Sequence, residues 1–281
     1  MIRQDYARKK RTIEIDDLRT FARIEEREDG GPIIDLITGR EPHVVGTKVC
    51  IKAGMRALPW ESNEAERPMI ELCETASPVR AMLSQPHELF MKVTGEPREW
   101  MYRPDLRLTV DVVFAEAVVN AVPFADAVCS WRPTEGQLAT KTLIVEVKRD
   151  DDPRFDDPIY LRKLELARQV YERIGWAFVW VTSSVDILHA ASARSVREVM
   201  LDHDVSLAPS DITVARRVLG AERKATLGEL VNALGSLGKC CALHVRRIIC
   251  MDMRNDLRPD TAVVGMPPSM SIFEMSRGQL W

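Results

Sequence analysis

The run Leu143–Lys148 constrains the fold more than any other stretch of this chain. Four of its six residues are aliphatic, and it ends with an acid and a lysine two positions apart, Glu146 and Lys148. A short aliphatic run of this kind favours a buried strand. Side chains two positions apart in a strand point to the same face, so Glu146 and Lys148 are predicted to project together while Val145 and Val147 enter the core.

A second strand-like run, Met101–Val110, carries a single acid, Asp105, directly after Pro104. Two carboxylates and a lysine at the ends of adjacent strands are the groups needed to hold a divalent metal and to activate a water beside it. An isolated Glu-x-Lys tripeptide is common by chance and is most often an ordinary strand-end charge. The hydrophobic strand before it and the Pro-Asp on a second strand together favour the functional interpretation.

The composition limits the class of protein. A chain of 281 residues with 46% hydrophobic residues can bury one large or two modest cores. Its formal net charge of −3 gives no general attraction to nucleic acid, so any DNA contact must come from local patches. No apolar run approaches the roughly 20 residues that span a bilayer, and the start lacks a signal-peptide pattern. The sequence therefore predicts a soluble cytoplasmic protein.

The six cysteines form no C-x-x-C pair and no regular framework, which suits a reducing compartment. Cys241, His244 and Cys250 lie close together in the sequence, but their spacing matches no standard zinc site.

Between residues 59 and 185 the pattern predicts helix, strand, strand, strand, helix and strand. The first helix starts near Ser62 with acids in its first turn, among them Glu66, and tolerates Pro68 only in that turn. The predicted strands are His87–Val93, Trp100–Phe114, Thr142–Lys148 and Trp176–Thr182. The second helix is capped by Asp157 and Pro158 and carries an amphipathic stripe of Tyr160, Leu164, Ala167, Tyr171 and Ile174.

The two ends of the chain differ in character. Residues 1–58 form a poorly defined N-terminal extension with a basic start that includes Arg8, Lys9 and Lys10. Residues 186–281 are predicted to be mostly helical, with helices at 193–201, 210–219, 226–234 and 241–251, a short strand at 261–264 and a loosely packed tail from Pro267. Helix, glycine-containing turn, helix and strand is the outline of a winged helix, although small helical subdomains share it. His244, Arg246 and Arg247 are expected on or near the outer face of the last helix.

The αβββαβ order with Glu66, Pro104-Asp105 and Glu146-Val147-Lys148 resembles the PD-(D/E)xK nuclease superfamily. Residues 60–275 look more narrowly like the TnsA-type endonuclease subunit of heteromeric, Tn-seven-like transposases. The similarity rests on Ser62–Arg67, Gln85-Pro86, Tyr102–Asp105, Val145–Lys148, Gly175–Val179 and Thr226–Leu230. The long insertion between Asp105 and Glu146 and the proline close to Glu66 depart from the family pattern.

The resemblance implies an α/β, restriction-endonuclease-like core at residues 59–185, followed by a winged-helix-like domain. It implies that Asp105, Glu146 and Glu66 hold Mg²⁺, for which Mn²⁺ substitutes, and that Val147 adds its backbone carbonyl. Lys148 would then orient or deprotonate the attacking water. The implied activity is an endonuclease that cuts the non-transferred (5′) strand of double-stranded DNA at transposon ends during cut-and-paste transposition.

The resemblance also implies two protein partners, a DDE-type transposase subunit and an AAA+ ATPase regulator that contacts the C-terminal domain. Two alternatives remain open from the sequence. One is a stand-alone restriction or repair-type nuclease with the same chemistry, and the other is a non-catalytic DNA-binding adaptor of a transposition complex. Retention of Asp105, Glu146 and Lys148 argues against the adaptor, since a scaffold has no need for all three.

Overall fold

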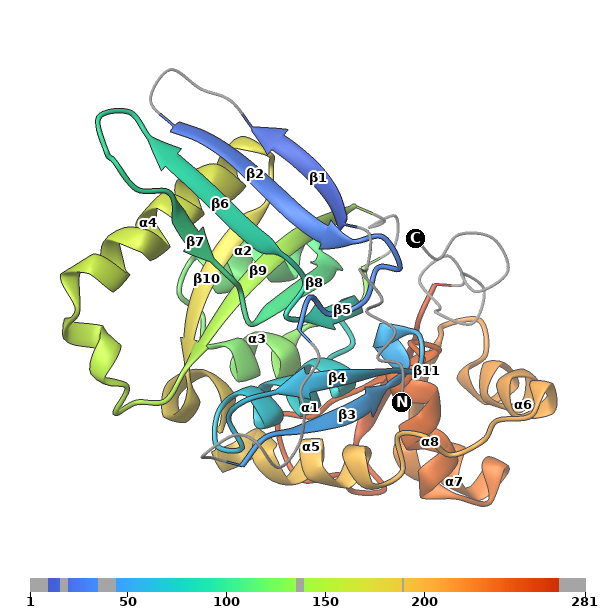
Figure 1. The fold of residues 1–281 in the computed structure, drawn as a ribbon. Helices are drawn as coiled ribbons and strands as arrows, with labels where there is room; N and C mark the ends of the chain where they lie inside the picture. The colour runs from blue at the N-terminus through green and yellow to red at the C-terminus, as the bar shows by residue number, and fades with distance from the viewer. Residues whose placement is uncertain (1–9, 16–19, 35–43, 135–138, 189, 268–281) are drawn as a thin grey trace, which may run out of the picture.

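A four-stranded mixed sheet lies at the centre of the molecule (Figure 1). The computed structural model describes residues 10–15, 20–34, 44–134, 139–188 and 190–267. The sheet has the order β10-β9-β8-β5, with β5 at Val79–Ser84, β8 at Leu106–Asp111, β9 at Thr140–Lys148 and β10 at Ala177–Thr182. β9 pairs with β10 in parallel and with β8 in antiparallel register, which sets Leu106 opposite Val145.

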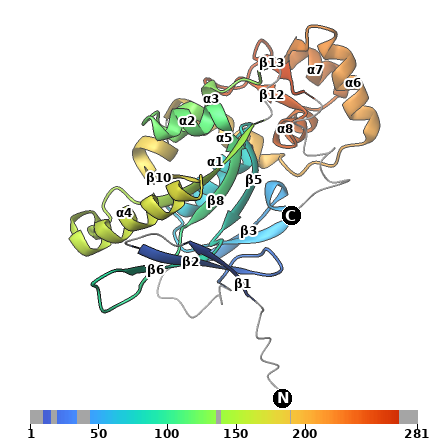
Figure 2. The same cartoon turned by 90° about the horizontal axis from the view of Figure 1, so that it is seen from above.

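The alternation of β9 divides its side chains between two cores. Leu143, Val145 and Val147 face the core that includes helix α1 (Glu66–Thr75), α2 (Val112–Val119) and α3 (Phe124–Ser130). Ile144 faces the opposite core, which is built on helix α4 (Pro158–Arg173). Both faces of β9 are therefore covered, and Figure 2 shows α2 and α3 on the side of the central sheet opposite β1, β2 and β6.

A second sheet, of order β1-β2-β6-β7, closes the α4 core. Its strands are β1 (Lys10–Ile15), β2 (Thr20–Arg27), β6 (Glu88–Val93) and β7 (Trp100–Tyr102). The described part of the N-terminal segment, predicted to be poorly defined, thus supplies β1 and β2 to this sheet, and β2 pairs with β6 from the middle of the chain. Arg8, Lys9 and the tail beyond Pro267 lie outside the described residues.

The hairpin of β3 (Gly46–Cys50) and β4 (Arg56–Trp60), joined through the short helix η1 (Ile51–Ala53), holds the end of α1. Buried Lys52 donates from Nζ to the carbonyls of Cys73 (3.1 Å) and Ala76 (2.6 Å). Unpaired carbonyls at a helix C-terminus favour such a cation. The hairpin therefore fixes the helix whose first residue is Glu66.

The predicted strand His87–Val93 is found as β6 (Glu88–Val93), but it belongs to the second sheet, and the first strand of the central sheet is β5, which was not predicted. Two other predicted elements between residues 62 and 114 differ in their bounds. The predicted strand Trp100–Phe114 is split at Pro104 into β7 and β8, and α2 starts at Val112. Helix α1 begins at Glu66, because Ser62 accepts the N–H of Ala65 in a preceding turn (3.1 Å). Pro68 does lie in the first turn.

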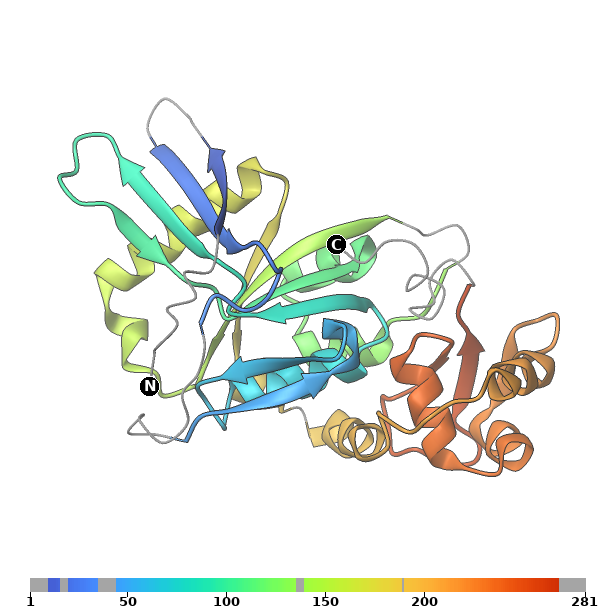
Figure 3. The ribbon, with the colours of Figure 1, turned by 45° about the vertical axis from the view of Figure 1, so that its right-hand side comes forward.

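In the central part, the short helix η2 (Pro153–Asp156) connects β9 to α4, and the π-helical turn η3 (Ser183–Ile187) follows β10. The C-terminal unit, in orange and red in Figure 3, gathers on one side of the molecule, away from the second sheet. It contains helices α5 (Ala190–Leu201), α6 (Pro209–Leu219), α7 (Leu227–Leu234) and α8 (Leu237–Val245). Its strands β11 (Lys224–Thr226), β12 (Ile249–Met251) and β13 (Ala262–Gly265) form a sheet of order β11-β13-β12.

The predicted helix at 241–251 is therefore wrong in its second half. The chain leaves α8 after Val245, turns at Arg247 in the left-handed region (φ 57°) and enters β12. His244 and Arg247, expected near the outer face, are both buried. The end of helix α8 and the turn after it are therefore packed against the central part of the molecule.

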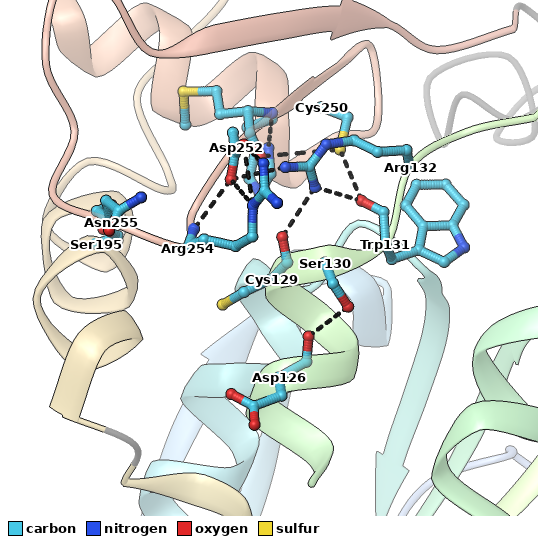
Figure 4. Close-up of polar contacts among 12 residues, drawn as sticks. Asp126, Cys129, Ser130, Trp131, Arg132, Ser195, Cys250, Asp252, Arg254 and Asn255 are labelled. Carbon is cyan, nitrogen blue, oxygen red and sulfur yellow. Dashed lines mark hydrogen bonds and ion pairs between the residues drawn. The ribbon is translucent and has the colours of Figure 1, made fainter. Parts of the chain in front are cut away.

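Polar contacts hold this interdomain seam, by which we mean the contact of α8 and β12 with α1, β8 and α3. His244 Nε2 lies 2.8 Å from the carbonyl of Thr75, and its Nδ1 accepts the N–H of Met251 (3.0 Å). Arg247 donates to Asp111 at the end of β8 (3.1 Å). Figure 4 shows a neighbouring contact across the seam, in which Arg132 reaches Asp252 (2.7 Å). Within the C-terminal unit, Ser195 donates to the carbonyl of Asn255 (2.6 Å).

The contacts at the seam also show whether Cys241, His244 and Cys250 are arranged as zinc ligands. Both ring nitrogens of His244 have backbone partners, and burial raises the thiol pKa of both cysteines. These three residues therefore serve packing rather than zinc binding. Within the described ranges, no helix is long and apolar enough to cross a membrane.

Candidate active site

A pocket of about 320 Å³ opens where the end of β9, the approach to β8 and the first turns of α1 and α4 meet. Glu66, Asp105, Glu146 and Lys148 all line it, together with Val147. The structure thus brings together every residue that the sequence predicted for the site. The other side chains used below, which also line the pocket, are Gln85, Tyr102, Arg103, Arg149, Asp152, Arg154, Tyr160 and Lys163.

Asp105 is fixed by the backbone on both sides of the pocket. It stands directly before β8, because Pro104 cannot donate a hydrogen bond to the sheet and separates β7 from β8. Its Oδ2 accepts the N–H of Val147 (2.6 Å), and its own carbonyl accepts the N–H of Gln85 (2.9 Å). Its side chain is 14% exposed, so one edge of the carboxylate remains open to the pocket.

Glu146 is almost fully buried, and both of its carboxylate oxygens have donors. The hydroxyl of Tyr102 donates to Oε2, whereas the hydroxyl of Tyr160 and the ammonium of Lys148 share Oε1. Tyr102 ends β7, and Tyr160 lies in the first turn of α4, so two elements outside the central sheet orient this carboxylate. A charged acceptor with three donors is held in one position.

Lys148 joins the two acids. Its Nζ pairs with Glu146, lies 3.8 Å from Asp105 Oδ2 and donates to the carbonyl of Val147 (3.1 Å). Burial lowers the pKa of Lys148, but the charges of Asp105 and Glu146 outweigh burial, and the pKa is raised overall. Lys148 therefore stays a cation beside the two carboxylates.

Glu66, the first residue of α1, enters the same pocket half-buried. Its Oε2 accepts the N–H of Glu61 (2.9 Å). Burial raises the pKa of Glu66 to about 7, and the carboxylates of Glu61 and Glu146 act in the same direction. The position that the proline left uncertain in the sequence is thus within the pocket.

The pocket holds more negative than positive charge at its centre. Burial raises the pKa of Asp105 well above its usual value, and the charges of Glu146 and Glu66 add to the shift. Three acids facing one lysine favour a bound cation, and carboxylate and carbonyl oxygens are the donors that Mg²⁺ takes. The chemistry of these donors is therefore of the kind that a hard divalent metal takes. Their arrangement is not that of a bound metal, since no three acids, histidines or cysteines in the described part of the chain form a metal-ligating cluster. Glu146 accepts from Tyr102, Tyr160 and Lys148, and Asp105 accepts the Val147 N–H, so both carboxylates would have to exchange donors to bind a metal.

Sequence reasoning missed Gln85, Tyr102, Tyr160 and Lys163 as parts of this pocket. The sequence pattern predicts Tyr160 as the first member of an apolar helical stripe, which is correct for its ring, since the residue belongs to the α4 core. Its hydroxyl also reaches the site, and periodicity carries no information about one polar atom. Gln85 and Tyr102 belong to the motifs Gln85-Pro86 and Tyr102–Asp105, which do not by themselves indicate a role for either side chain.

No family model of known proteins matches the chain, and no curated protein matches it.

Proposed function

We propose that the protein is a metal-dependent DNA endonuclease of the PD-(D/E)xK type. The observation that carries the proposal is the convergence of Glu66, Asp105, Glu146 and Lys148 in one pocket, from a helix and two adjacent strands. The order α1, β5, β8, β9, α4 and β10 around a mixed sheet is compatible with a restriction-endonuclease-like core. The order α6, β11, α7, α8, β12 and β13 is likewise compatible with a winged helix.

In this proposal Asp105, Glu146 and Glu66 would hold Mg²⁺ or Mn²⁺ together with the Val147 carbonyl. The metal would lower the pKa of a bound water and offset the charge that develops on the phosphate. Lys148 would orient the attacking water and donate to a phosphate oxygen, where a preorganised ammonium stabilises negative charge. Tyr102 and Tyr160 would keep the Glu146 carboxylate aimed into the pocket.

The biological role that we propose is cleavage of the non-transferred (5′) strand at transposon ends, beside a DDE-type transposase and under an AAA+ ATPase regulator. This assignment is supported by the motif resemblance.

The burial of α8 bears on how DNA would be bound. The helix that a winged helix usually places in the major groove is here covered by the central part of the molecule, so DNA would be engaged at the pocket rather than through α8. The exposed side chains of α6 and α7 are left for the regulator.

The test is cleavage of end-labelled duplex DNA in Mg²⁺ or Mn²⁺ by the wild type, Asp105→Ala and Asp260→Ala, with and without a candidate transposase. Asp260 is an exposed aspartate between β12 and β13 and is the matched control. We expect cutting by the wild type and by Asp260→Ala and none by Asp105→Ala. Dependence on the transposase would support the transposon role, and cutting without it would favour a stand-alone nuclease. Equal cutting by all three variants would refute the proposed site.

A further inference from the structure

The cations around the pocket fall into two groups. Most of them are neutralised by a nearby acid: Lys148 by Glu146, Arg103 by Glu88, Arg149 by Asp151 and Arg154 by Asp152. Lys163, on α4, has no hydrogen bond or ion pair among the residues that the structure describes. It lies within the electrostatic influence of Glu146 and Asp157 but forms no direct ion pair with either of them.

Lys163 is held close to the site by an aromatic ring. Its Nζ lies 5.1 Å from the ring centroid of Tyr160, the residue that donates to Glu146, and Lys148 Nζ lies 5.5 Å from the same ring. The residue is half-buried, and burial lowers the pKa of Lys163, although the charges of Glu146 and Asp157 act in the opposite direction. A half-buried ammonium that makes no ion pair is stabilised further when an anionic ligand reaches it.

Gln85 presents a second unpartnered donor to the same pocket. Its backbone is fixed, because its N–H donates to Asp105 (2.9 Å) and its carbonyl accepts from Ile33 (2.7 Å). The residue is 5% exposed, and its side-chain amide makes no hydrogen bond in the described ranges. The amide is not among the fully buried polar atoms that lack a partner, so it faces the water of the pocket. Gln85 also adopts a left-handed backbone (φ 47°) that non-glycine residues rarely take, and strain of this kind gathers at ligand-binding sites.

We propose that Lys163 and Gln85 form a subsite for a backbone phosphate of the DNA strand, next to the phosphate that is cut. The inference rests on the proposed nuclease function, which supplies the DNA. An ammonium and an amide NH₂ are both donors, and no acid pairs with either of them, so the missing group is an anionic acceptor. In the proposed mechanism Lys148 contacts the scissile phosphate. Lys163 and Gln85 would therefore contact the neighbouring phosphate of the same strand.

The experiment measures the affinity of fluorescein-labelled duplex DNA by anisotropy in Ca²⁺, an oxygen-seeking ion used in place of Mg²⁺ to limit hydrolysis. We expect Lys163→Gln to weaken binding about tenfold and to reduce the slope of log K against log salt by about 1, as for the loss of one phosphate contact. Lys163→Arg should restore both values. The matched control is Lys141→Gln, at the far end of β9 from Lys148, which should leave affinity and slope unchanged.

Gln85 is tested with a pair of substitutions that separates charge from fold. Gln85→Glu has the same shape but repels a phosphate, and should weaken binding more than Gln85→Asn, which keeps an amide and tolerates the left-handed backbone. Thermal unfolding of each variant shows whether the fold is retained. Lys163→Gln and Gln85→Glu binding like Lys141→Gln would overturn the subsite.

Failure of the subsite can be told apart from failure of the nuclease proposal. Wild-type cleavage that Asp105→Ala abolishes, together with unaltered DNA binding by Lys163→Gln, would remove the subsite and leave the nuclease in place. A wild type that neither binds nor cuts DNA in any of these metals would overturn both.

Discussion

Two aspartates at opposite ends of β8 have contrasting surroundings. Asp111, the last residue of the strand, is fully buried in the interdomain seam, and each of its oxygens meets a guanidinium, Arg80 at 2.7 Å and Arg247 at 3.1 Å. Asp105, just before the strand, meets one backbone N–H and a lysine 3.8 Å away that it shares with Glu146.

The difference lies in charge balance rather than in burial. At the seam one acid faces two arginines, and burial lowers the pKa of Arg247 to about 10 against the attraction of Asp111. In the pocket three acids face one lysine, and the pKa of Asp105 is raised. Each oxygen of Asp111 has a cationic partner, which suits a structural role, whereas the acids of the pocket outnumber their lysine, and unpaired buried acids are typical of a functional site.

Neutralising Asp105 is expected to give the largest effect, a great loss of cleavage without a loss of stability. Asp105→Asn should lower cleavage about 10⁴-fold, equivalent to about 5.5 kcal/mol of activation free energy, because the metal loses a charged ligand. The free energy of unfolding should stay level or rise by about 1 kcal/mol, since the pocket loses surplus negative charge. Single-turnover cleavage and urea unfolding measure the two values. A marked loss of stability would place Asp105 with Asp111 as a structural residue.

Asp111→Ala should have the opposite profile. Removing one partner of a buried charge set costs about 3–5 kcal/mol, because Arg80 and Arg247 are left without their anion. Urea unfolding measures this loss, and the exposed Asp260→Ala should change stability by no more than about 0.5 kcal/mol. Adding Arg247→Met to Asp111→Ala should recover part of the loss. An unfolding free energy equal to that of the wild type would show that the seam does not depend on this acid.

Acid should weaken the seam through His244. Burial lowers the pKa of His244 to about 3, and its Nδ1 already accepts the Met251 N–H, so a proton cannot be added without losing that bond. Between pH 6.5 and 3 the unfolded chain binds the proton and the folded chain does not, so stability falls as the pH falls, by about 1.4 kcal/mol per unit. At pH 5 the loss is therefore about 2 kcal/mol from this residue.

Thermal unfolding at pH 7 and pH 5 checks the expectation for His244. His244→Gln, which keeps one donor and one acceptor, should be less stable at pH 7 but should lose less stability between the two pH values. An unchanged pH dependence in this variant would assign the acid sensitivity to another group. In that case the buried His87, whose pKa burial also lowers to about 3, would be the next residue to substitute as the source of the acid sensitivity.

The smallest effect concerns how Glu146 is held. Tyr160→Phe removes the hydroxyl that donates to Glu146 and keeps the ring, so we expect about tenfold weaker Mn²⁺ binding, in line with the loss of a group that orients a metal ligand. Isothermal titration calorimetry measures the affinity without any cleavage. Tyr171→Phe, on the same helix but bonded to His87, is the control. Equal affinities for the two variants would show that Tyr160 contributes packing alone.

The sequence predicted best where one physical signal dominated. β9 followed from its aliphatic run and α4 from its apolar stripe and its Asp157 cap, which accepts the N–H of Ile159 (2.9 Å). The acids and the lysine of the pocket were predicted because they are charged residues at the ends of such elements. β5 was missed because Arg80 interrupts its apolar pattern, and that arginine pairs with Asp111 at the end of the neighbouring strand β8.

Tertiary contacts explain the other differences. Val112 and Val113 favour a strand by propensity, yet they open α2, which brings Phe114 edge-to-face against Phe124. The turn at Arg247 has no glycine, so a helical pattern ran through it unbroken. The hydroxyls of Tyr102 and Tyr160 converge on Glu146 from β7 and α4, a meeting that the order of residues along the chain cannot express.

The burial of α8 has a consequence for how this chain could be recombined. A boundary near residue 186 suggests a detachable C-terminal module, but His244 and Arg247 find their partners on α1 and β8. A chimera that exchanged residues 186–281 alone would leave the Thr75 carbonyl without His244 and would leave Asp111 with Arg80 as its one guanidinium partner. A folded hybrid is expected only if the new C-terminal unit comes from a protein whose own residues at positions 75, 80 and 111 match those of this chain. Substitutions on the two sides of the seam would therefore have to be inherited together.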